Sequence, residues 1–301
     1  MDAPETHNAA ARRYRIGVAL GGGSARGYAH IGALASLERH GFPPDLIVGT
    51  SFGALIGALY ASGRSPTDLR EEAAAMRRRD VFPHIADFGL HKGALFGGRR
   101  LEAYFDAMVE GRSFEDLHRP LIVVATDVDT GERVLLSSGP LAPALRASAS
   151  IPGVFAPVTV GGRRLMDGGI GSPVPLDTLR GFDVDLAIGI GAGMEATDSR
   201  TIRAARRFLG TDVGQRLHRS LGQGSRRNVA ARLGRALACA ADGWLAEVDD
   251  ESNLHVHTRP PIHWLNFHRA ELAIRAGDEA LNSFIPRIRQ AMATATAAVP
   301  A

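Results

Sequence analysis

The chain has 301 residues, of which 45% are hydrophobic and 22% charged, and its formal net charge at pH 7 is +3. These proportions are ordinary for a globular protein with a sizeable core. The single cysteine, Cys239, excludes an internal disulfide framework, and the small charge excess is no argument for a nucleic-acid partner.

Residues 1–13 are polar and lack the apolar stretch of a signal peptide, so we expect a disordered tail on a cytoplasmic protein. No run of about 18 apolar residues is present, so we expect no membrane-spanning helix. The mild positive excess favours peripheral contact with an anionic surface such as the inner membrane. Residues 14–290 are expected to form one α/β domain with a helical insertion rich in arginine and alanine at about 196–250.

The first buried strand is expected at 15–20 and runs into a glycine-rich loop, which is followed by a helix that Gly41 ends. A dinucleotide-binding loop is one interpretation, but Arg26 stands where its third glycine belongs, and Asp45 precedes the second strand instead of ending it. A plain tight turn is another. An oxyanion hole fits better, because consecutive glycines let backbone N–H groups point into a cleft. Its candidate residues are Gly21, Gly22, Gly23, Ser24, Arg26 and Gly27.

The second buried strand, 46–48, ends in a G-x-S-x-G sequence centred on Ser51, and a helix of small residues follows over 54–61. This order is typical of a nucleophile elbow, in which Gly49 and Gly53 lack side chains so that strand and helix can pass closely. Such a turn exposes the Ser51 hydroxyl at the carboxyl end of the sheet and at a helix N-terminus. The alternative is a glycine-rich helix start with a chance serine.

The stretch 64–118 is expected to be helical and lid-like, with apolar, loop-rich segments at 81–90 and 94–98. A helix over 98–110 places apolar side chains on one face, and packing on the core is favoured over a lid beside an acyl pocket. These side chains are Leu101, Tyr104, Phe105 and Met108.

A strand over 121–126, a returning strand over 133–136 and a helix over 141–150 follow, and then a hairpin over 158–166 leads to Asp167. Gly168 and Gly169 keep the space around this carboxylate open. An Asp–Gly surface turn is common, but within hydrogen-bond reach of Ser51 the carboxylate could take the serine proton directly. We expect Asp127 and Asp129 to stabilise a turn and not to bind a metal.

The last part of the chain adds a strand over 185–190, arginine-rich helices with solvated faces over 194–250, and a closing helix over 267–280. His255 and His257 alternate onto one strand face and, with His263 and His268, form a histidine-rich patch. Because no cysteine or carboxylate joins them at ligand spacing, we expect neither a metal nor a cofactor.

Three separate sequence motifs follow one another along the chain: the loop at 21–27, the elbow at 49–53 and Asp167-Gly168-Gly169. Together they resemble the patatin-like phospholipases, the bacterial members in particular. The resemblance covers about residues 15–195, including the connecting segments 125–127 and 148–157, with a looser match at 264–286.

The resemblance implies a three-layer α/β/α sandwich with a mostly parallel central sheet. It also implies hydrolysis of lipid acyl esters without a metal, with Ser51 as nucleophile, Asp167 as its only catalytic partner and the loop at 21–27 as oxyanion hole. Phe52 departs from the small or unbranched residue that is usual there and could narrow the acyl pocket. The segment 196–250 lies outside the shared core.

Besides dinucleotide binding by the glycine-rich loop, two other functions stay open. One is an α/β-hydrolase esterase with a Ser–Asp–His triad based on His263 or His268. The other is a non-catalytic regulatory or membrane-binding protein on the same fold. The sequence does not specify the lipid head group, the acyl chain length, the choice between hydrolysis and acyl transfer, or the oligomeric state.

Overall fold

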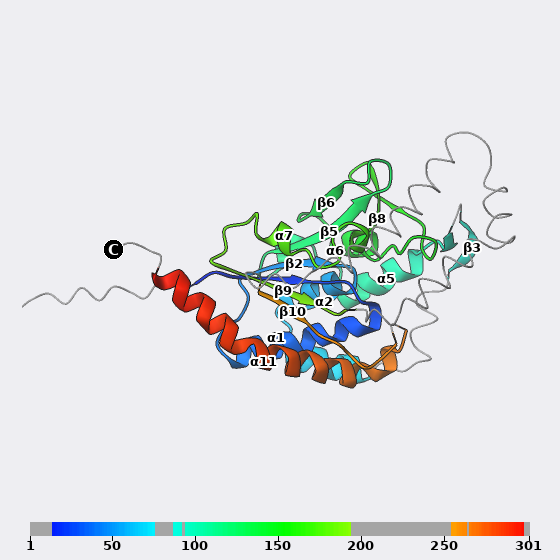
Figure 1. Ribbon diagram of the computed structural model, residues 1–301. Coiled ribbons are helices and arrows are strands. Elements are labelled where there is room, and N and C mark those ends of the chain that lie inside the picture. Colours follow the sequence, from blue (N-terminus) through cyan, green and yellow to red (C-terminus); the bar gives the residue numbers. More distant parts are fainter. Residues whose placement is uncertain (1–13, 76–86, 92–93, 194–253, 264, 298–301) are drawn as a thin grey trace, which may run out of the picture.

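A computed structural model describes residues 14–75, 87–91, 94–193, 254–263 and 265–297 (Figure 1). Within these residues eight strands form one mixed sheet in the order β10-β9-β1-β2-β5-β8-β7, and β6 also pairs with β5. Their bounds are β1 Ile16–Leu20, β2 Leu46–Thr50, β5 Leu121–Asp127, β6 Arg133–Leu136, β7 Val158–Val160, β8 Arg163–Asp167, β9 Leu186–Gly191 and β10 Leu254–His257. Strands β10, β9, β1, β2 and β5 run parallel, whereas β6, β8 and β7 add antiparallel pairs. The mostly parallel sheet expected from the sequence is therefore confirmed.

Helices cover both faces of this sheet, as the sandwich expectation requires (Figure 1). The larger core joins one face of the sheet to α1, α2, α5, α6 and α11, and the smaller core joins the other face to α7 and its flanking loop. The bounds are α1 Ala29–Arg39, α2 Phe52–Ala61, α3 Pro66–Ala75, α5 Arg99–Met108, α6 Leu141–Ser148, α7 Leu176–Leu179 and α11 Ala270–Ala297. The 3₁₀ turns are η1 Ser24–Tyr28, η2 Phe114–Asp116, η3 Gly168–Ile170 and η5 Phe267–Arg269, and β3 Phe88–His91 pairs with β4 Ala94–Phe96.

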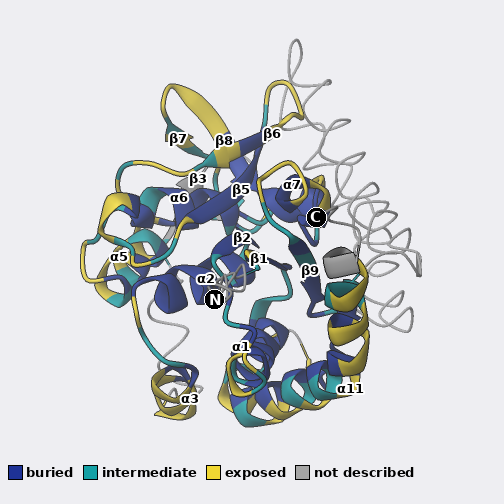
Figure 2. Cartoon of the chain, turned by 90° about the vertical axis from the view of Figure 1, so that its left-hand side faces the viewer, coloured by how far each residue is buried: buried dark blue, intermediate teal, exposed yellow. Residues whose placement is uncertain are grey.

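The central strands are apolar throughout because both of their faces are covered. All five residues of β2 are buried; Ile47 belongs to the larger core, while Leu46 and Val48 belong to the smaller one. Figure 2 shows the central strands buried, and the hairpin of β7 and β8 and the outward faces of α3 and α11 partly exposed.

Helix α11 is longer than the sequence predicted. It continues beyond residue 280 and through Pro286 to Ala297. The reason is that its apolar face continues, with Leu281, Phe284, Ile285 and Ile288 all buried. This burial offsets the hydrogen bond that a proline inside a helix removes.

Helices α1 and α11 approach each other through two glycines. A Cβ on Gly32 would lie 1.9 Å from the Ile274 carbonyl oxygen, and a Cβ on Gly277 would lie 1.9 Å from the Ala29 carbonyl oxygen. Only glycine therefore permits the two backbones to come this close.

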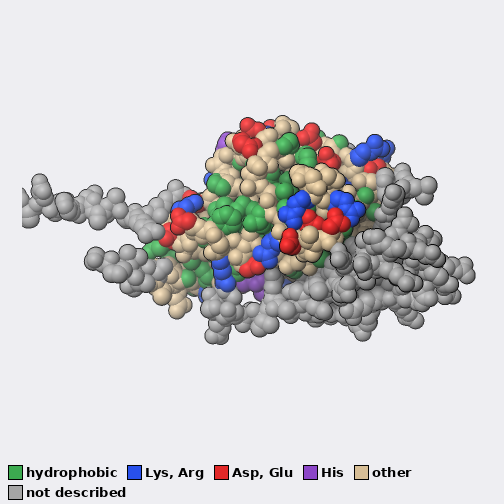
Figure 3. Space-filling model, turned by 90° about the horizontal axis from the view of Figure 1, so that it is seen from above, with side chains coloured by type: hydrophobic (Ala, Val, Ile, Leu, Met, Phe, Trp, Pro, Cys, Tyr) green, Lys and Arg blue, Asp and Glu red, His purple; other side chains and the backbone are tan. Residues whose placement is uncertain are grey.

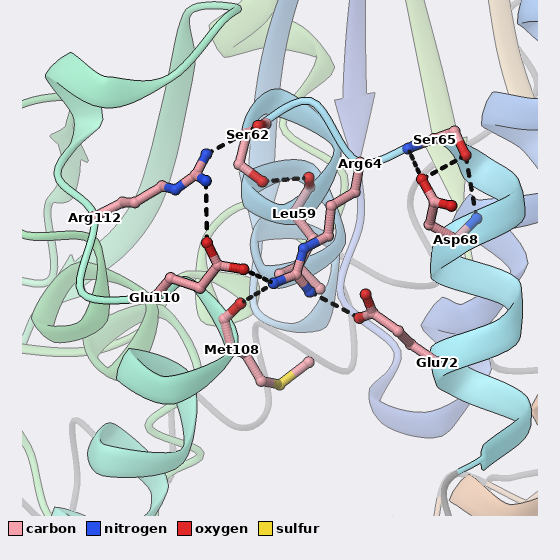
Figure 4. A network of polar contacts seen from close by, with 9 residues as sticks. All are labelled: Leu59, Ser62, Arg64, Ser65, Asp68, Glu72, Met108, Glu110 and Arg112. Atoms are coloured by element: carbon pink, nitrogen blue, oxygen red, sulfur yellow. Dashed lines mark hydrogen bonds and ion pairs between the residues drawn. The ribbon is translucent and has the colours of Figure 1, made fainter.

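A polar network joins the end of α2 to α3 and to the end of α5 (Figure 4). Arg64 donates to Glu72 Oε2 at 2.7 Å, to Glu110 Oε1 at 3.0 Å and to the Met108 carbonyl at 2.7 Å. Arg112 completes it by donating to Glu110 Oε2 and to the Ser62 carbonyl, both at 3.0 Å. The network links α3 and the end of α5 to the segment that follows α2.

The core-packing expectation for 98–110 is confirmed, since Leu101 and Phe105 are buried and Tyr104 and Met108 pack against the same core. The lid alternative covers the whole stretch 64–118, of which 76–86 and 92–93 lie outside the described residues, and it stays untested. The expected tail at 1–13 and the insertion at 196–250 also lie outside them.

The surface mixes both signs of charge, as Figure 3 shows for the face seen from above. Ion pairs join Arg163 to Asp127 at 2.7 Å and Arg164 to Asp129 at 2.8 Å. Asp127 Oδ1 also accepts from the N–H groups of Asp129 and Thr130, so the turn role expected for Asp127 is confirmed.

Candidate active site

The turn between β2 and α2 has the geometry of a nucleophile elbow. Ser51 adopts φ 54° and ψ −124°, a conformation that a residue with a side chain takes only under strain. A Cβ on Gly49 would lie 2.5 Å from Ala54 Cα, and a Cβ on Gly53 would lie 2.4 Å from the Leu20 carbonyl oxygen. Both glycines are therefore required by close backbone contacts, as the sequence pattern indicated.

The strained backbone of Ser51 is held by Ser148, at the end of α6. Ser51 N–H donates to Ser148 Oγ at 2.7 Å, and this hydroxyl donates in turn to the Val124 carbonyl at 2.6 Å. Ser148 is fully buried. The sequence analysis placed Ser148 in a connecting segment and missed this role, because a lone serine at a helix end gives no sign of a distant partner.

Asp167 lies across one strand from Ser51. Strand β5 pairs with β2 at Thr50↔Val124 and with β8 at Ala125↔Asp167, so adjacent positions of β5 bring the two residues together. Ser51 Oγ donates to Asp167 Oδ2 at 2.8 Å. A serine at a helix N-cap commonly accepts from the first turn of its helix; here its hydroxyl is directed to the carboxylate instead.

The Asp167 carboxylate is buried, with 7% of the residue exposed, and this burial raises its pKa from 3.8 to about 6. Hydrogen bonds from Gly169 N–H to Oδ1, at 2.7 Å, and from Ser51 lower the pKa by less. A Cβ on Gly168 would lie 2.3 Å from the Val124 carbonyl oxygen. Gly168 therefore permits the close approach to β5, and Gly169 supplies a donor.

The glycine-rich loop divides into anchored and unengaged N–H groups. Gly21 N–H donates to the Ile190 carbonyl and Gly22 N–H to the Pro173 carbonyl, both at 2.9 Å. In the described part of the chain, the N–H groups of Gly23 and Ser24 have no acceptor. Both residues are half-buried, and so is Gly22, where an added Cβ would lie 3.4 Å from Ser51 Cβ.

Other residues in and next to the loop make buried contacts near the site. Arg26 is buried, and its Nη1 donates to the Gly193 carbonyl at 3.4 Å. A Cβ on Gly27 would lie 2.6 Å from the Phe52 ring, so this glycine makes room for that side chain. His30, which the sequence analysis did not single out, places Nε2 at 2.7 Å from the Gly21 carbonyl oxygen.

Phe52 belongs to an aromatic cluster beside Ser51. Its ring packs edge-on against Tyr28, with centroids 4.9 Å apart, and lies 5.9 Å from the ring of Phe267. Phe52 and Phe267 are half-buried, and Leu265 nearby in sequence is 53% exposed. The residue that follows Ser51 thus belongs to a partly exposed aromatic cluster.

The histidine patch does not form a metal cluster in the described residues. His255 and His257 share a face of β10 with ring centroids 4.1 Å apart. His263 and His268 are exposed. No group of three or more potential ligands gathers anywhere in the described ranges.

Asp45, considered as a nucleotide ligand, accepts from Ile16 N–H at 2.9 Å. This bond lies at the first residue of β1, at the strand end opposite the glycine-rich loop. Asp45 thus joins the starts of two strands. Over the same described ranges, no helix is both long and apolar enough to cross a bilayer.

These features define an α/β protein with a serine–aspartate site at the carboxyl edge of its parallel strands. Residues 18–180 match the family described as patatin-like phospholipase, so the chain belongs to the patatin-like phospholipase family, whose members are generally serine lipid hydrolases.

Among its relatives is an uncharacterized NTE family protein of Mycobacterium tuberculosis, 38% identical over 187 residues, which cover 62% of this chain and 51% of that protein. Patatin-like phospholipase domain-containing protein 6 of Homo sapiens is 34% identical over 191 residues, or 62% of this chain and 14% of that protein. The chain thus matches about half of the length of the first relative and about a seventh of the second. The crystal structure of VipD from Legionella pneumophila aligns with a TM-score of 0.49 and 13% identity over 92% of this chain and 67% of that one.

Proposed function

We propose that the protein is a serine acyl hydrolase that cleaves lipid acyl esters through a Ser51–Asp167 dyad. The observation that carries the proposal is the 2.8 Å hydrogen bond from Ser51 Oγ to Asp167 Oδ2 at a strained elbow. Family membership and the aromatic cluster beside Ser51 favour an acyl chain as the group transferred.

In the first half-reaction, Ser51 Oγ attacks the ester carbonyl carbon while its proton passes to Asp167 Oδ2. A carboxylate with a pKa of about 6 is a better base than one at 3.8, because it holds the proton more tightly and is still mostly ionised at neutral pH. The proton then passes to the leaving alcohol as the tetrahedral intermediate collapses to the acyl-enzyme.

In the second half-reaction, water takes the place of the alcohol. Asp167 accepts a proton from the water as its oxygen attacks the acyl carbon, and the proton returns to Ser51 Oγ as the fatty acid leaves. Both intermediates carry negative charge on the former carbonyl oxygen. The unengaged N–H groups of Gly23 and Ser24 are the donors we assign to this oxyanion, with the N-terminus of α2 adding a favourable dipole.

The test is a reaction of the full chain with a fluorophosphonate probe and with a panel of short-chain esters, lysophospholipids and phospholipids. Ser51→Ala should abolish labelling and lower kcat by a factor on the order of 10⁴ or more. Ser283→Ala is the matched control, since its hydroxyl is exposed on α11 and donates to the Ala280 carbonyl. A folded wild-type chain that neither labels nor hydrolyses any of these esters would favour the non-catalytic alternative.

The triad alternative is tested in the same assay with His263→Ala and His268→Ala. The dyad predicts that both variants keep activity close to wild type, because the Ser51 hydroxyl already donates to Asp167. Loss of activity in either variant, comparable to that of Ser51→Ala, would replace the dyad with a triad.

The lipid substrate is expected at a membrane surface, and the exposed side chain of Leu265, two residues before Phe267 in the chain, supports peripheral contact there. Sedimentation with anionic and neutral vesicles tests this expectation. The cytoplasmic location expected from the sequence stays a prediction.

A further inference from the structure

A fully buried histidine lies beneath the glycine-rich loop. His30, on the first turn of α1, has no exposed surface, and its Nε2 lies 2.7 Å from the Gly21 carbonyl oxygen. Since the partner is a carbonyl, Nε2 carries the hydrogen and donates. Its other nitrogen, Nδ1, is buried with no hydrogen-bond partner in the described part of the chain.

Stability of the fold does not by itself explain this arrangement. A neutral ring with hydrogen on Nε2 leaves Nδ1 as a bare acceptor in the interior, and unpaired buried acceptors destabilise a fold. Burial lowers the pKa of His30 from 6.5 to about 4, so the ring stays neutral at pH 7 and keeps one donor only. An apolar side chain would avoid the unpaired nitrogen but would lose the bond to Gly21.

The bond acts on the peptide that begins the loop. The peptide between Gly21 and Gly22 is held on both sides, since its carbonyl accepts from His30 and its N–H donates to the Pro173 carbonyl at 2.9 Å. The same Gly21 carbonyl oxygen also abuts the elbow, because a Cβ on Gly53 would lie 2.5 Å from it. The loop and the first turn of α2 therefore meet at the oxygen that His30 holds.

We propose that His30 is a positioning residue for the oxyanion hole, an inference that rests on the proposed function. By fixing the Gly21–Gly22 peptide, it sets where the following N–H groups of Gly23 and Ser24 point relative to Ser51. His30 does not touch the substrate; it acts through the loop.

The test compares His30→Leu, His30→Gln and His40→Leu in the full chain with a short-chain ester. Glutamine can place an amide donor near the position of Nε2, whereas leucine cannot donate. His40 is the matched control, because it lies just after the last residue of α1 and its Nδ1 lies 2.8 Å from the Ser36 carbonyl oxygen, away from the loop.

We expect His30→Leu to lower kcat roughly 10- to 100-fold while KM changes less than about 3-fold, since a displaced oxyanion donor weakens the transition state more than substrate binding. His30→Gln should recover most of the rate, and His40→Leu should match wild type. Thermal unfolding of each variant reports whether the fold is intact.

Two results would overturn the inference: an unchanged kcat in folded His30→Leu, or equal losses in the leucine and glutamine variants. Nitrogen NMR of the wild-type imidazole gives a check that needs no variant, because hydrogen on Nδ1 instead of Nε2 would also refute it. The wild-type rate tests the proposed function and the variant-to-wild-type ratio tests the inference. A wild type without esterase activity therefore marks failure of the former and removes the basis of the latter.

Discussion

Replacing Asp167 with asparagine should remove activity and yet stabilise the protein. The folded protein holds this carboxyl group at a pKa of about 6, against 3.8 for an ordinary aspartate. A difference of this size corresponds to ~3 kcal/mol, at about 1.4 kcal/mol for each pKa unit. Because the pKa is raised in the folded state, the native protein binds the proton more tightly than the unfolded chain. The free energy of unfolding therefore falls as pH rises from about 4 to about 6 and is lowest above that range.

Asparagine keeps the acceptor for Gly169 N–H and does not ionise. The stability difference between Asp167→Asn and wild type should therefore grow by up to ~3 kcal/mol between about pH 4 and about pH 7. Urea unfolding of both proteins at several pH values measures it. The same pKa predicts that wild-type kcat/KM rises with pH through about 6, with about a tenth of the plateau left at about pH 5. A stability difference that does not change with pH, or a rate profile with its midpoint near 4, would refute the reasoning.

Two further substitutions test the packing that supports the site. Ser148→Ala removes both the acceptor for the N–H of Ser51 and the donor to β5. The free energy of unfolding, measured with urea, should therefore fall by about 1–3 kcal/mol, and kcat should also fall. The control Ser283→Ala should change neither the free energy of unfolding nor kcat. Gly277→Ala drives a methyl group into the α1 backbone and should cost about 3 kcal/mol or more by calorimetry, while Gly171→Ala, with open space around it, should cost little. A Gly277→Ala protein as stable as wild type would mean that the two helices can separate at no cost.

The local parts of the site were accessible to sequence analysis. The turn at Ser51 follows from short-range rules, because an apolar run, two glycines two residues either side of a serine, and a small-residue helix leave few alternatives. Its two glycines do make the close contacts that this pattern predicts. The central strands were equally readable, since a strand covered on both faces is a continuous apolar run.

The long-range parts were not readable in the same way. The position of Asp167 depends on the antiparallel register of β8 against β5, which no local pattern specifies. The family resemblance, and not the periodicity of the sequence, implied that Asp167 is the catalytic partner of Ser51. The division of the glycine-rich loop into anchored and unengaged N–H groups depends on the carbonyls of Pro173 and Ile190, which are distant in the chain. His30 escaped notice because a histidine in an apolar helix looks like any other core residue.

The glycine contact between α1 and α11 also bears on how the chain can be divided. The stretch that matches the family ends at residue 180, yet Gly277 and Ile274 lie directly against the helix that carries His30. A fragment that stops at the family boundary would leave one side of α1 bare and exposed to water, with apolar residues that normally meet α11. The segment that gives the family its signature is therefore not an independent unit, and an inactive excised fragment would reveal nothing about the chemistry of the whole chain.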